Sequence, residues 1–252
     1  MLKTINNQTI YYEKHGQSKN TILILPGWGE TKQTFNYLIN NLKENYTIYI
    51  LDYPGFGNSK IPNKTLTIYD YAKTINCLIK ELNIINPIII AHSFGGRIIS
   101  ILISKYKLKV KKLILIDVSG IKTRKPLKIY LKEKLYKLLK IIIKLFPKRK
   151  RNILSQKLLN TFASNDYKSL PNTMHQTFKN IISEDLSNHY KNITQETLIL
   201  WGEKDQDTPL KNAYKLRKLI PNSELIILKN ASHYPYLNYP YLTLKIINEY
   251  LK

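Results

Sequence analysis

One serine of this chain lies in a pattern that can turn a hydroxyl group into a nucleophile. Ser93 stands in the run Ala91-His92-Ser93-Phe94-Gly95, after the apolar residues 87–91 and before a segment with helical spacing of apolar side chains. A sharp turn from a buried strand into a helix holds a serine at the end of a sheet, beside a helix N-terminus. The pattern predicts Ser93 as a candidate nucleophile, with an ordinary helix N-cap serine as the alternative.

A serine nucleophile needs a histidine to take its proton and a carboxylate to orient that histidine. Asp205 follows the apolar run 197–201, and His233 follows the run 224–228. Only His233, of five histidines, comes after the last expected strand. Asp117, after the run 112–116, and Asp207 are alternative carboxylates. The order and spacing favour a triad of Ser93, Asp205 and His233.

The reaction also needs backbone N–H groups that stabilise a developing oxyanion. The residue after the nucleophile, Phe94, supplies one such group in this type of turn. The loop Pro26-Gly27-Trp28-Gly29, after the apolar run 21–25, predicts the backbone N–H of Trp28 as the second. A plain Pro-Gly turn is the alternative for this loop.

Apolar runs alternate with helical patterns along the chain, as in an α/β protein with a mostly parallel sheet. The expected strands are residues 9–13, 21–25, 47–51, 87–91, 112–116, 197–201 and 224–228. The expected helices are residues 35–42, 68–82, 97–105, 209–220 and 240–251. The stretch 121–195 shows no clear strand. We therefore expect a core domain of residues 1–120 and 196–252, interrupted by a helical cap insertion of residues 121–195.

Composition limits the classes of protein that fit. A chain of 252 residues, 43% hydrophobic, can bury one substantial core. It has one cysteine and therefore no internal disulfide. We find neither a signal peptide pattern nor an apolar stretch that could span a membrane, so a cytoplasmic location is expected. Nothing in the sequence implies a metal or an organic cofactor.

Of the formal net charge of +23, net +12 lies in residues 122–151 of the expected insertion, from 13 basic residues minus one acid, Glu133. Leucines and isoleucines on one helical face, with lysines on another, predict an amphipathic helix or helix pair. Either these lysines are simply solvated on a cap, or the cap also meets an anionic lipid surface or an acidic substrate. We expect no nucleic acid partner, because no nucleic-acid module interrupts the pattern.

The chain resembles the α/β-hydrolase superfamily, in particular its helical-capped branch of carboxylesterases, lipases and carbon–carbon bond hydrolases. The resemblance covers nearly the whole chain and rests on five motifs in order: Leu25-Pro26-Gly27-Trp28-Gly29, Asp52-Tyr53-Pro54-Gly55-Phe56-Gly57-Asn58-Ser59, Ala91-His92-Ser93-Phe94-Gly95-Gly96, Trp201-Gly202-Glu203-Lys204-Asp205 with Pro209, and Ser232-His233-Tyr234-Pro235-Tyr236-Leu237.

The resemblance implies a nucleophile at Ser93, an acid at Asp205 and a base at His233. It also implies oxyanion donors at Trp28 and Phe94. Three positions depart from the family pattern: Pro26 replaces a histidine, and Ala91 and Ser232 replace glycines. A serine nucleophile argues against the dehalogenase and epoxide hydrolase branches, which use aspartate.

We therefore expect a serine hydrolase that cleaves a small to medium apolar ester through an acyl-enzyme intermediate. A carbon–carbon bond hydrolase with the same triad is the alternative enzyme. A non-catalytic member of the fold, binding a small ligand or a membrane surface, is the alternative outside catalysis.

Overall fold

The computed structural model describes residues 1–122, 127–162, 167–168 and 170–252. The chain divides into two compact units, residues 1–122 with 176–252, and residues 123–175. Residues 176–195 thus group with the sheet, whereas the expected insertion ran from residue 121 to residue 195. Parts of that insertion, residues 123–126, 163–166 and 169, lie outside the described residues. A cap role for residues 123–175 stays a prediction.

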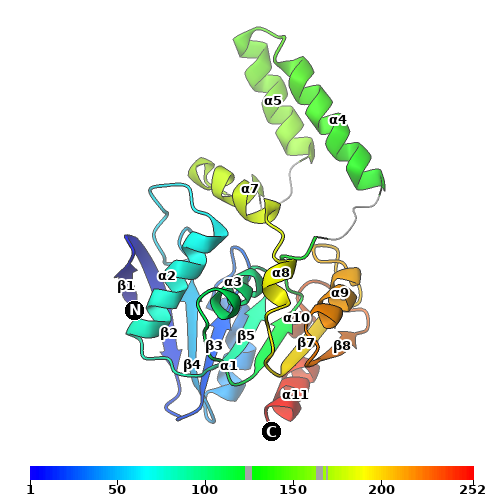
Figure 1. The fold of residues 1–252 in the computed structure, drawn as a ribbon. Coiled ribbons are helices and arrows are strands. Elements are labelled where there is room, and N and C mark those ends of the chain that lie inside the picture. Colours follow the sequence, from blue (N-terminus) through cyan, green and yellow to red (C-terminus); the bar gives the residue numbers. More distant parts are fainter. Residues whose placement is uncertain (123–126, 163–166, 169) are drawn as a thin grey trace. The chain divides into compact units, whose positions relative to one another are not determined.

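The first unit is built on one eight-stranded sheet in the order β1-β2-β4-β3-β5-β6-β7-β8 (Figure 1). The first two strands pair antiparallel, and β2 also pairs antiparallel with β4. All further neighbours are parallel, from β4 through β8. The strands are β1 (Leu2–Ile5), β2 (Gln8–His15), β3 (Thr21–Leu25), β4 (Thr47–Asp52), β5 (Ile88–His92), β6 (Leu113–Ile116), β7 (Thr197–Gly202) and β8 (Ser223–Leu228).

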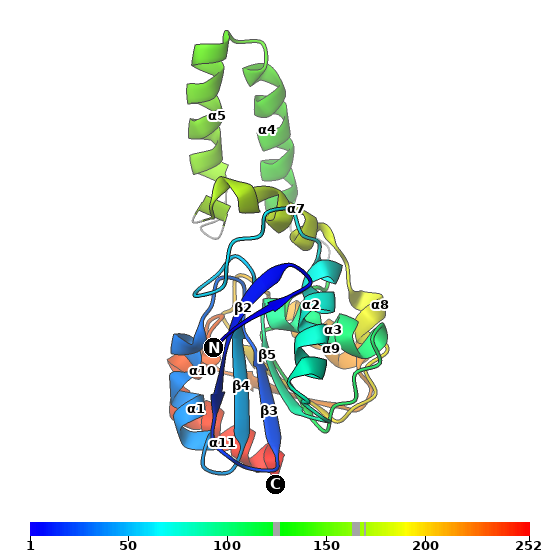
Figure 2. The same cartoon turned by 90° about the vertical axis from the view of Figure 1, so that its left-hand side faces the viewer.

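Helices cover both faces of this sheet (Figure 2). The helices that group with the sheet are η1 (Lys32–Phe35), α1 (Asn36–Leu42), α2 (Ile68–Glu81), α3 (Phe94–Ser104), α7 (His175–Ser183), α8 (Ser187–Tyr190), α9 (Lys211–Leu219), α10 (Pro235–Asn238) and α11 (Pro240–Leu251), of which α7 lies beyond the edge of the sheet and not on a face. Because side chains alternate along a strand, Leu23 and Leu25 belong to the core cluster that contains buried residues of α2, α3 and α9, while Ile22 and Ile24 belong to the cluster that contains those of α1 and α11. This is the three-layered α/β-hydrolase fold that the sequence predicted, and the prediction of a mostly parallel sheet is confirmed.

The second unit contains α4 (Leu127–Ile143) and α5 (Lys148–Phe162), followed by the short helix η2 (Asn172–Met174). The expected amphipathic segment therefore forms a helix pair. None of the helices among the described residues is long and apolar enough to cross a membrane.

Candidate active site

Ser93 lies at the tight turn between β5 and α3. Its backbone has φ of +45° and ψ of −107°, a strained combination for a residue with a side chain. A Cβ atom on Gly95 would lie 2.0 Å from the carbonyl oxygen of Leu25, and one on Gly96 would lie 2.3 Å from Val118 Cβ. Only residues without a side chain fit there, so the start of α3 approaches the end of β3 and the segment after β6 closely. The Ser93 side chain at this turn is partly exposed.

Asp205 lies in the loop after β7, where several donors hold its carboxylate. The backbone N–H groups of Asp207 and Thr208 donate to Oδ1, at 2.8 and 2.9 Å. The Thr208 hydroxyl donates to Oδ2 at 2.5 Å. Gly202, at the end of β7, passes so close to Ser232 that a Cβ atom would lie 2.1 Å from the Ser232 carbonyl oxygen. This close approach brings the Asp205 loop against the loop that carries His233.

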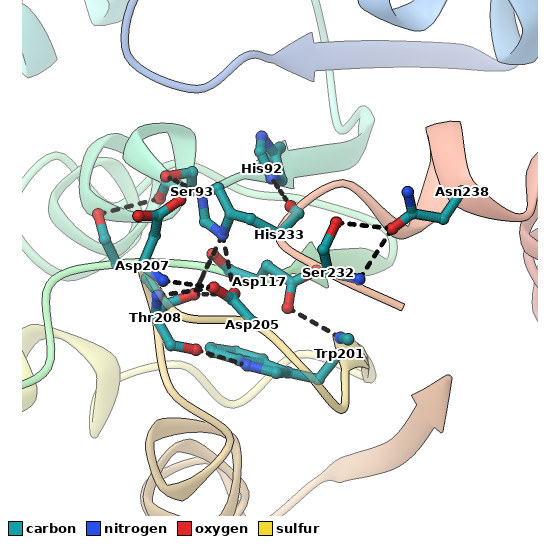
Figure 3. A network of polar contacts seen from close by, with 12 residues as sticks. His92, Ser93, Asp117, Trp201, Asp205, Asp207, Thr208, Ser232, His233 and Asn238 are labelled. Atoms are coloured by element: carbon teal, nitrogen blue, oxygen red, sulfur yellow. Dashed lines mark hydrogen bonds and ion pairs between the residues drawn. The ribbon is translucent and has the colours of Figure 1, made fainter. Parts of the chain in front are cut away.

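His233 joins the other two residues into one network (Figure 3). Its Nδ1 lies 2.8 Å from Asp205 Oδ2, and its Nε2 lies 3.0 Å from Ser93 Oγ. The carboxylate can only accept, so Nδ1 carries a hydrogen and Nε2 presents its lone pair to the serine hydroxyl. The structure thus brings together the three residues that the sequence analysis selected, in the geometry needed for proton transfer from Ser93.

Interactions within this network stabilise the protonated form of His233, once it has formed, and the ionised form of Asp205. Burial alone would lower the pKa of His233, but its hydrogen bond to Asp205 and the negative charge of that group outweigh burial and raise it. Burial would raise the pKa of Asp205, but the interactions with His233 and Thr208 lower it. An imidazolium that forms after proton transfer is therefore stabilised by the carboxylate beside it.

The two alternative carboxylates do not contact His233 through a hydrogen bond. Asp117, after β6, is fully buried, and its Oδ1 accepts from the backbone N–H of Gly202 at 2.9 Å. Burial, followed by the charge of Asp205, raises the pKa of Asp117 to about 10, so Asp117 is neutral at neutral pH. Asp207 is exposed and contributes its backbone N–H to Asp205. The geometry favours Asp205 as the partner of His233.

The two expected oxyanion donors lie in neighbouring turns. Phe94 is the first residue of α3, and Trp28 lies in the turn from Gly27 to Glu30. The rings of Trp28 and Phe94 pack edge to face, with centroids 5.1 Å apart. Neither backbone N–H donates to another residue among those the structure describes. Both groups are therefore available to a ligand, and their catalytic role stays a prediction.

A second buried polar cluster, which the sequence analysis missed, lies next to the triad. Glu30 Oε1 lies 2.8 Å from His92 Nδ1 and 3.2 Å from the hydroxyl of Tyr236, while Oε2 accepts from the backbone N–H of Gly27 at 2.6 Å. His92 Nε2 donates to the backbone carbonyl oxygen of His233 at 2.8 Å. The cluster thus ties the loop that carries Trp28 to the backbone of His233.

The interactions within this cluster favour an ionised Glu30. Burial would raise the pKa of Glu30, but the positive charge of His92 and the hydrogen bonds from His92, Gly27 and Tyr236 lower it. A sequence signal existed: Glu30 is a carboxylate in a glycine-containing loop, and His92 is next to Ser93. The sequence did not show that Glu30 and His92 contact each other, because they are brought together only when the chain folds.

Two residues of the Ser93 network, Asp205 and His233, form with Asp117 the one group of possible metal ligands within the described part of the chain. One ligand atom each from Asp117, Asp205 and His233 lies within 4.8 Å of the others. However, Asp205 Oδ2 and His233 Nδ1 already bond to each other, and Asp117 is neutral at neutral pH. These donors suit a hydrogen-bond network better than a cation site.

Known proteins are similar to this chain in sequence and in fold. Lipase 3 of Moraxella sp. (strain TA144) is 25% identical over 250 residues, covering 91% of this chain and 76% of its own length. Pimeloyl-[acyl-carrier protein] methyl ester esterase of Wigglesworthia glossinidia brevipalpis is 28% identical, covering 94% of this chain and 95% of its own length.

A solved esterase from Exiguobacterium antarcticum superposes with a TM-score of 0.76 at 24% identity. The superposition covers 99% of this chain and 98% of that esterase. The profile of the family described as alpha/beta hydrolase fold matches residues 20–240. With the eight-stranded sheet and the serine at its strand-to-helix turn, that match establishes that the chain belongs to the alpha/beta hydrolase fold family.

Proposed function

We propose that this chain is a serine hydrolase that cleaves carboxylic esters of small to medium apolar acyl groups. The observation that carries the proposal is the continuous contact from Ser93 Oγ through the His233 ring to Asp205 Oδ2, at 3.0 and 2.8 Å. The lipase and esterase relatives are consistent with ester chemistry.

In this mechanism, His233 takes the proton of Ser93 as the hydroxyl oxygen attacks the ester carbonyl carbon. The negative charge that develops on the carbonyl oxygen is stabilised by the backbone N–H groups of Trp28 and Phe94. The protonated His233 then gives its proton to the departing alcohol, which leaves an acyl group on Ser93. Water, deprotonated by His233, attacks the acyl-enzyme and releases the carboxylic acid.

A series of p-nitrophenyl esters from acetate to laurate tests this proposal and measures the preferred acyl length. Wild-type protein should hydrolyse at least one ester, whereas Ser93→Ala should retain only a trace of that activity. Ser155→Ala is the matched control, because Ser155 is an exposed serine in α5 of the second unit. Equal activity in wild type and Ser93→Ala would reject the nucleophile.

A methyl ester of an acyl chain carried on a protein is the second candidate substrate. It is favoured by the relative from Wigglesworthia glossinidia brevipalpis, which matches nearly end to end and whose name states that substrate. Hydrolysis of free methyl esters alongside the p-nitrophenyl series would support this candidate.

Two alternatives give different results in the same assays. A carbon–carbon bond hydrolase would react with a fluorophosphonate through Ser93 but turn over none of the esters. A non-catalytic member of the fold would do neither. A cytoplasmic location also stays a prediction.

A further inference from the structure

A long apolar face of the α4–α5 pair is exposed, and no described residue of its own unit covers it. Helices α4 and α5 lie side by side, with the rings of Tyr136 and Phe162 5.6 Å apart (Figures 1 and 2). Half-buried side chains on this side of α4 include Tyr136, Leu139 and Ile143. The residues of another face are all exposed: Leu127, Leu131, Leu135, Leu138, Ile142 and Leu145. We call these six residues the apolar stripe.

The spacing of the apolar stripe shows that it is one continuous surface. The first five members lie within α4 and recur every three or four residues, which places them on one side of that helix, and Leu145 lies two residues beyond its end. Leu131 is 54% exposed and Leu145 is 83% exposed, values far from those of core leucines in this chain. Such a row of exposed leucines in water is unfavourable unless another apolar phase covers it.

Basic residues surround the apolar stripe. Residues 122–151 carry 13 lysines and arginines and one acid. Lys134, Lys137 and Lys144 lie on α4 or just beyond its end, and all are exposed. At the start of α5, Lys148, Arg149 and Lys150 are exposed and Arg151 is half-buried. The pair of helices thus combines an apolar surface with a strong local positive charge.

Few kinds of binding partner can both cover the apolar stripe and neutralise the basic residues around it. An RNA would neutralise the lysines but would not cover six leucines and isoleucines. A second copy of this chain could cover the apolar stripe but would bring two strongly positive surfaces together. The surface of an anionic bilayer offers acyl chains for the stripe and phosphate groups for the lysines, whose long stems reach from an apolar layer to the headgroups.

We propose that the α4–α5 pair is a docking surface for membranes of anionic phospholipid, with the apolar stripe entering the lipid layer and the surrounding basic residues meeting the headgroups. The geometry is that of a helix lying in the membrane surface, in keeping with the absence of a membrane-crossing helix among the described residues. This inference uses no residue of the triad, so it holds or fails independently of the proposed chemistry.

The test is co-sedimentation of the purified full-length protein with vesicles. We expect binding to phosphatidylcholine vesicles that contain about 30% phosphatidylglycerol, and at least about tenfold weaker binding to phosphatidylcholine alone. Raising NaCl from roughly 50 mM to roughly 500 mM should weaken the binding substantially, because salt screens exposed charges.

Two pairs of variants separate this surface from the general positive charge of the protein. Neutralising Lys148, Arg149, Lys150 and Arg151 to glutamine should weaken vesicle binding by at least about tenfold. The matched control neutralises four exposed lysines of the first unit, Lys60, Lys80, Lys109 and Lys229, and should change binding far less.

The second pair tests the apolar stripe. Leu131→Gln, Leu138→Gln and Leu145→Gln combined should weaken binding by at least about tenfold. The matched control is Ile61→Gln, Ile85→Gln and Leu242→Gln combined, three exposed apolar positions of the first unit. Circular dichroism melting curves are recorded for each variant to check that it is folded.

Several results would overturn the proposal. One is that the protein does not bind anionic vesicles at low salt. Another is that the surface variants and their controls lose vesicle binding equally. Binding to single-stranded RNA or to an acidic acyl carrier protein without vesicle binding would assign the basic residues to another partner. A dimer in light scattering that dissociates in the leucine variants, again without vesicle binding, would assign the apolar stripe to self-association.

Discussion

His92 Nδ1 lies 2.8 Å from Glu30 Oε1 in the protein interior, one hydrogen bond away from the backbone of His233. His92 is fully buried and Glu30 is nearly so. Both ring nitrogens of His92 face acceptors, the Glu30 carboxylate and the His233 carbonyl oxygen. The pair therefore connects the loop of one expected oxyanion donor, Trp28, with the histidine of the triad.

Glu30→Gln tests whether this pair positions the site. The substitution replaces the buried carboxylate that contacts His92 Nδ1 and the Tyr236 hydroxyl with a neutral amide, so the free energy of unfolding should fall by about 2 kcal/mol. If the pair also positions Trp28 and His233, kcat should fall roughly tenfold with little change in KM. Glu44→Gln, at an exposed glutamate, is the control. A stability loss with unchanged kcat would limit Glu30 to a structural role.

Asp205→Asn should lower kcat by about a thousandfold or more while leaving the protein folded. An amide can donate to His233 Nδ1, which would hold the imidazole in the wrong tautomer for accepting the serine proton. Steady-state kinetics on the preferred p-nitrophenyl ester measure the effect. A variant with more than about a tenth of wild-type kcat would show that another group orients His233.

The pH dependence of kcat/KM follows from the pKa of His233. The base must be neutral to accept a proton, so activity falls as the pH drops through that pKa. Asp205 raises it above the ordinary histidine value of about 6.5, so the acid midpoint should lie above that value. In the residual activity of Asp205→Asn, the midpoint should move to lower pH. An upward shift would contradict the assigned contact.

Asp117→Asn should leave activity within a few fold of wild type and increase stability. The folded-state pKa of Asp117 is raised to about 10, so its contribution to stability is lost as the pH rises from about 4 towards that value. Asparagine has no proton to lose and can keep the hydrogen bond from Gly202. The unfolding free energy at pH 8 should rise by about 1 kcal/mol or more. Urea unfolding at pH 5 and pH 8 measures this, and a loss of stability at pH 8 would contradict a neutral Asp117.

The sequence was sufficient to predict that Ser93, Asp205 and His233 lie close together, because each follows an apolar run typical of a strand. Parallel strands bring their carboxyl ends to one edge of a sheet, so Ser93, Asp205 and His233 had to converge. All the strands except β1, and most helices of the first unit, were predictable for the same reason, since their apolar spacing is regular.

Features that depend on packing between distant segments were not predictable. The Glu30–His92 pair and the neutral state of Asp117 arise from burial, which no local pattern reports. Helix α7 offers another example. The Thr177 hydroxyl accepts from the backbone N–H of Leu66, and the Phe178 ring packs 5.5 Å from that of Trp28, so this helix groups with the sheet. The sequence of α7 alone does not distinguish it from the other helical segments of the expected insertion.

The central claim, that Ser93 is the nucleophile, is tested most directly by locating the residue that a fluorophosphonate modifies. Wild-type protein is reacted with the probe, digested, and mapped by mass spectrometry, with Ser93→Ala, His233→Ala and Ser155→Ala in parallel. We predict a single adduct on Ser93 in wild type and Ser155→Ala, none in Ser93→Ala, and much slower labelling in His233→Ala. An adduct on another residue, or undiminished labelling of Ser93→Ala, would contradict the assignment.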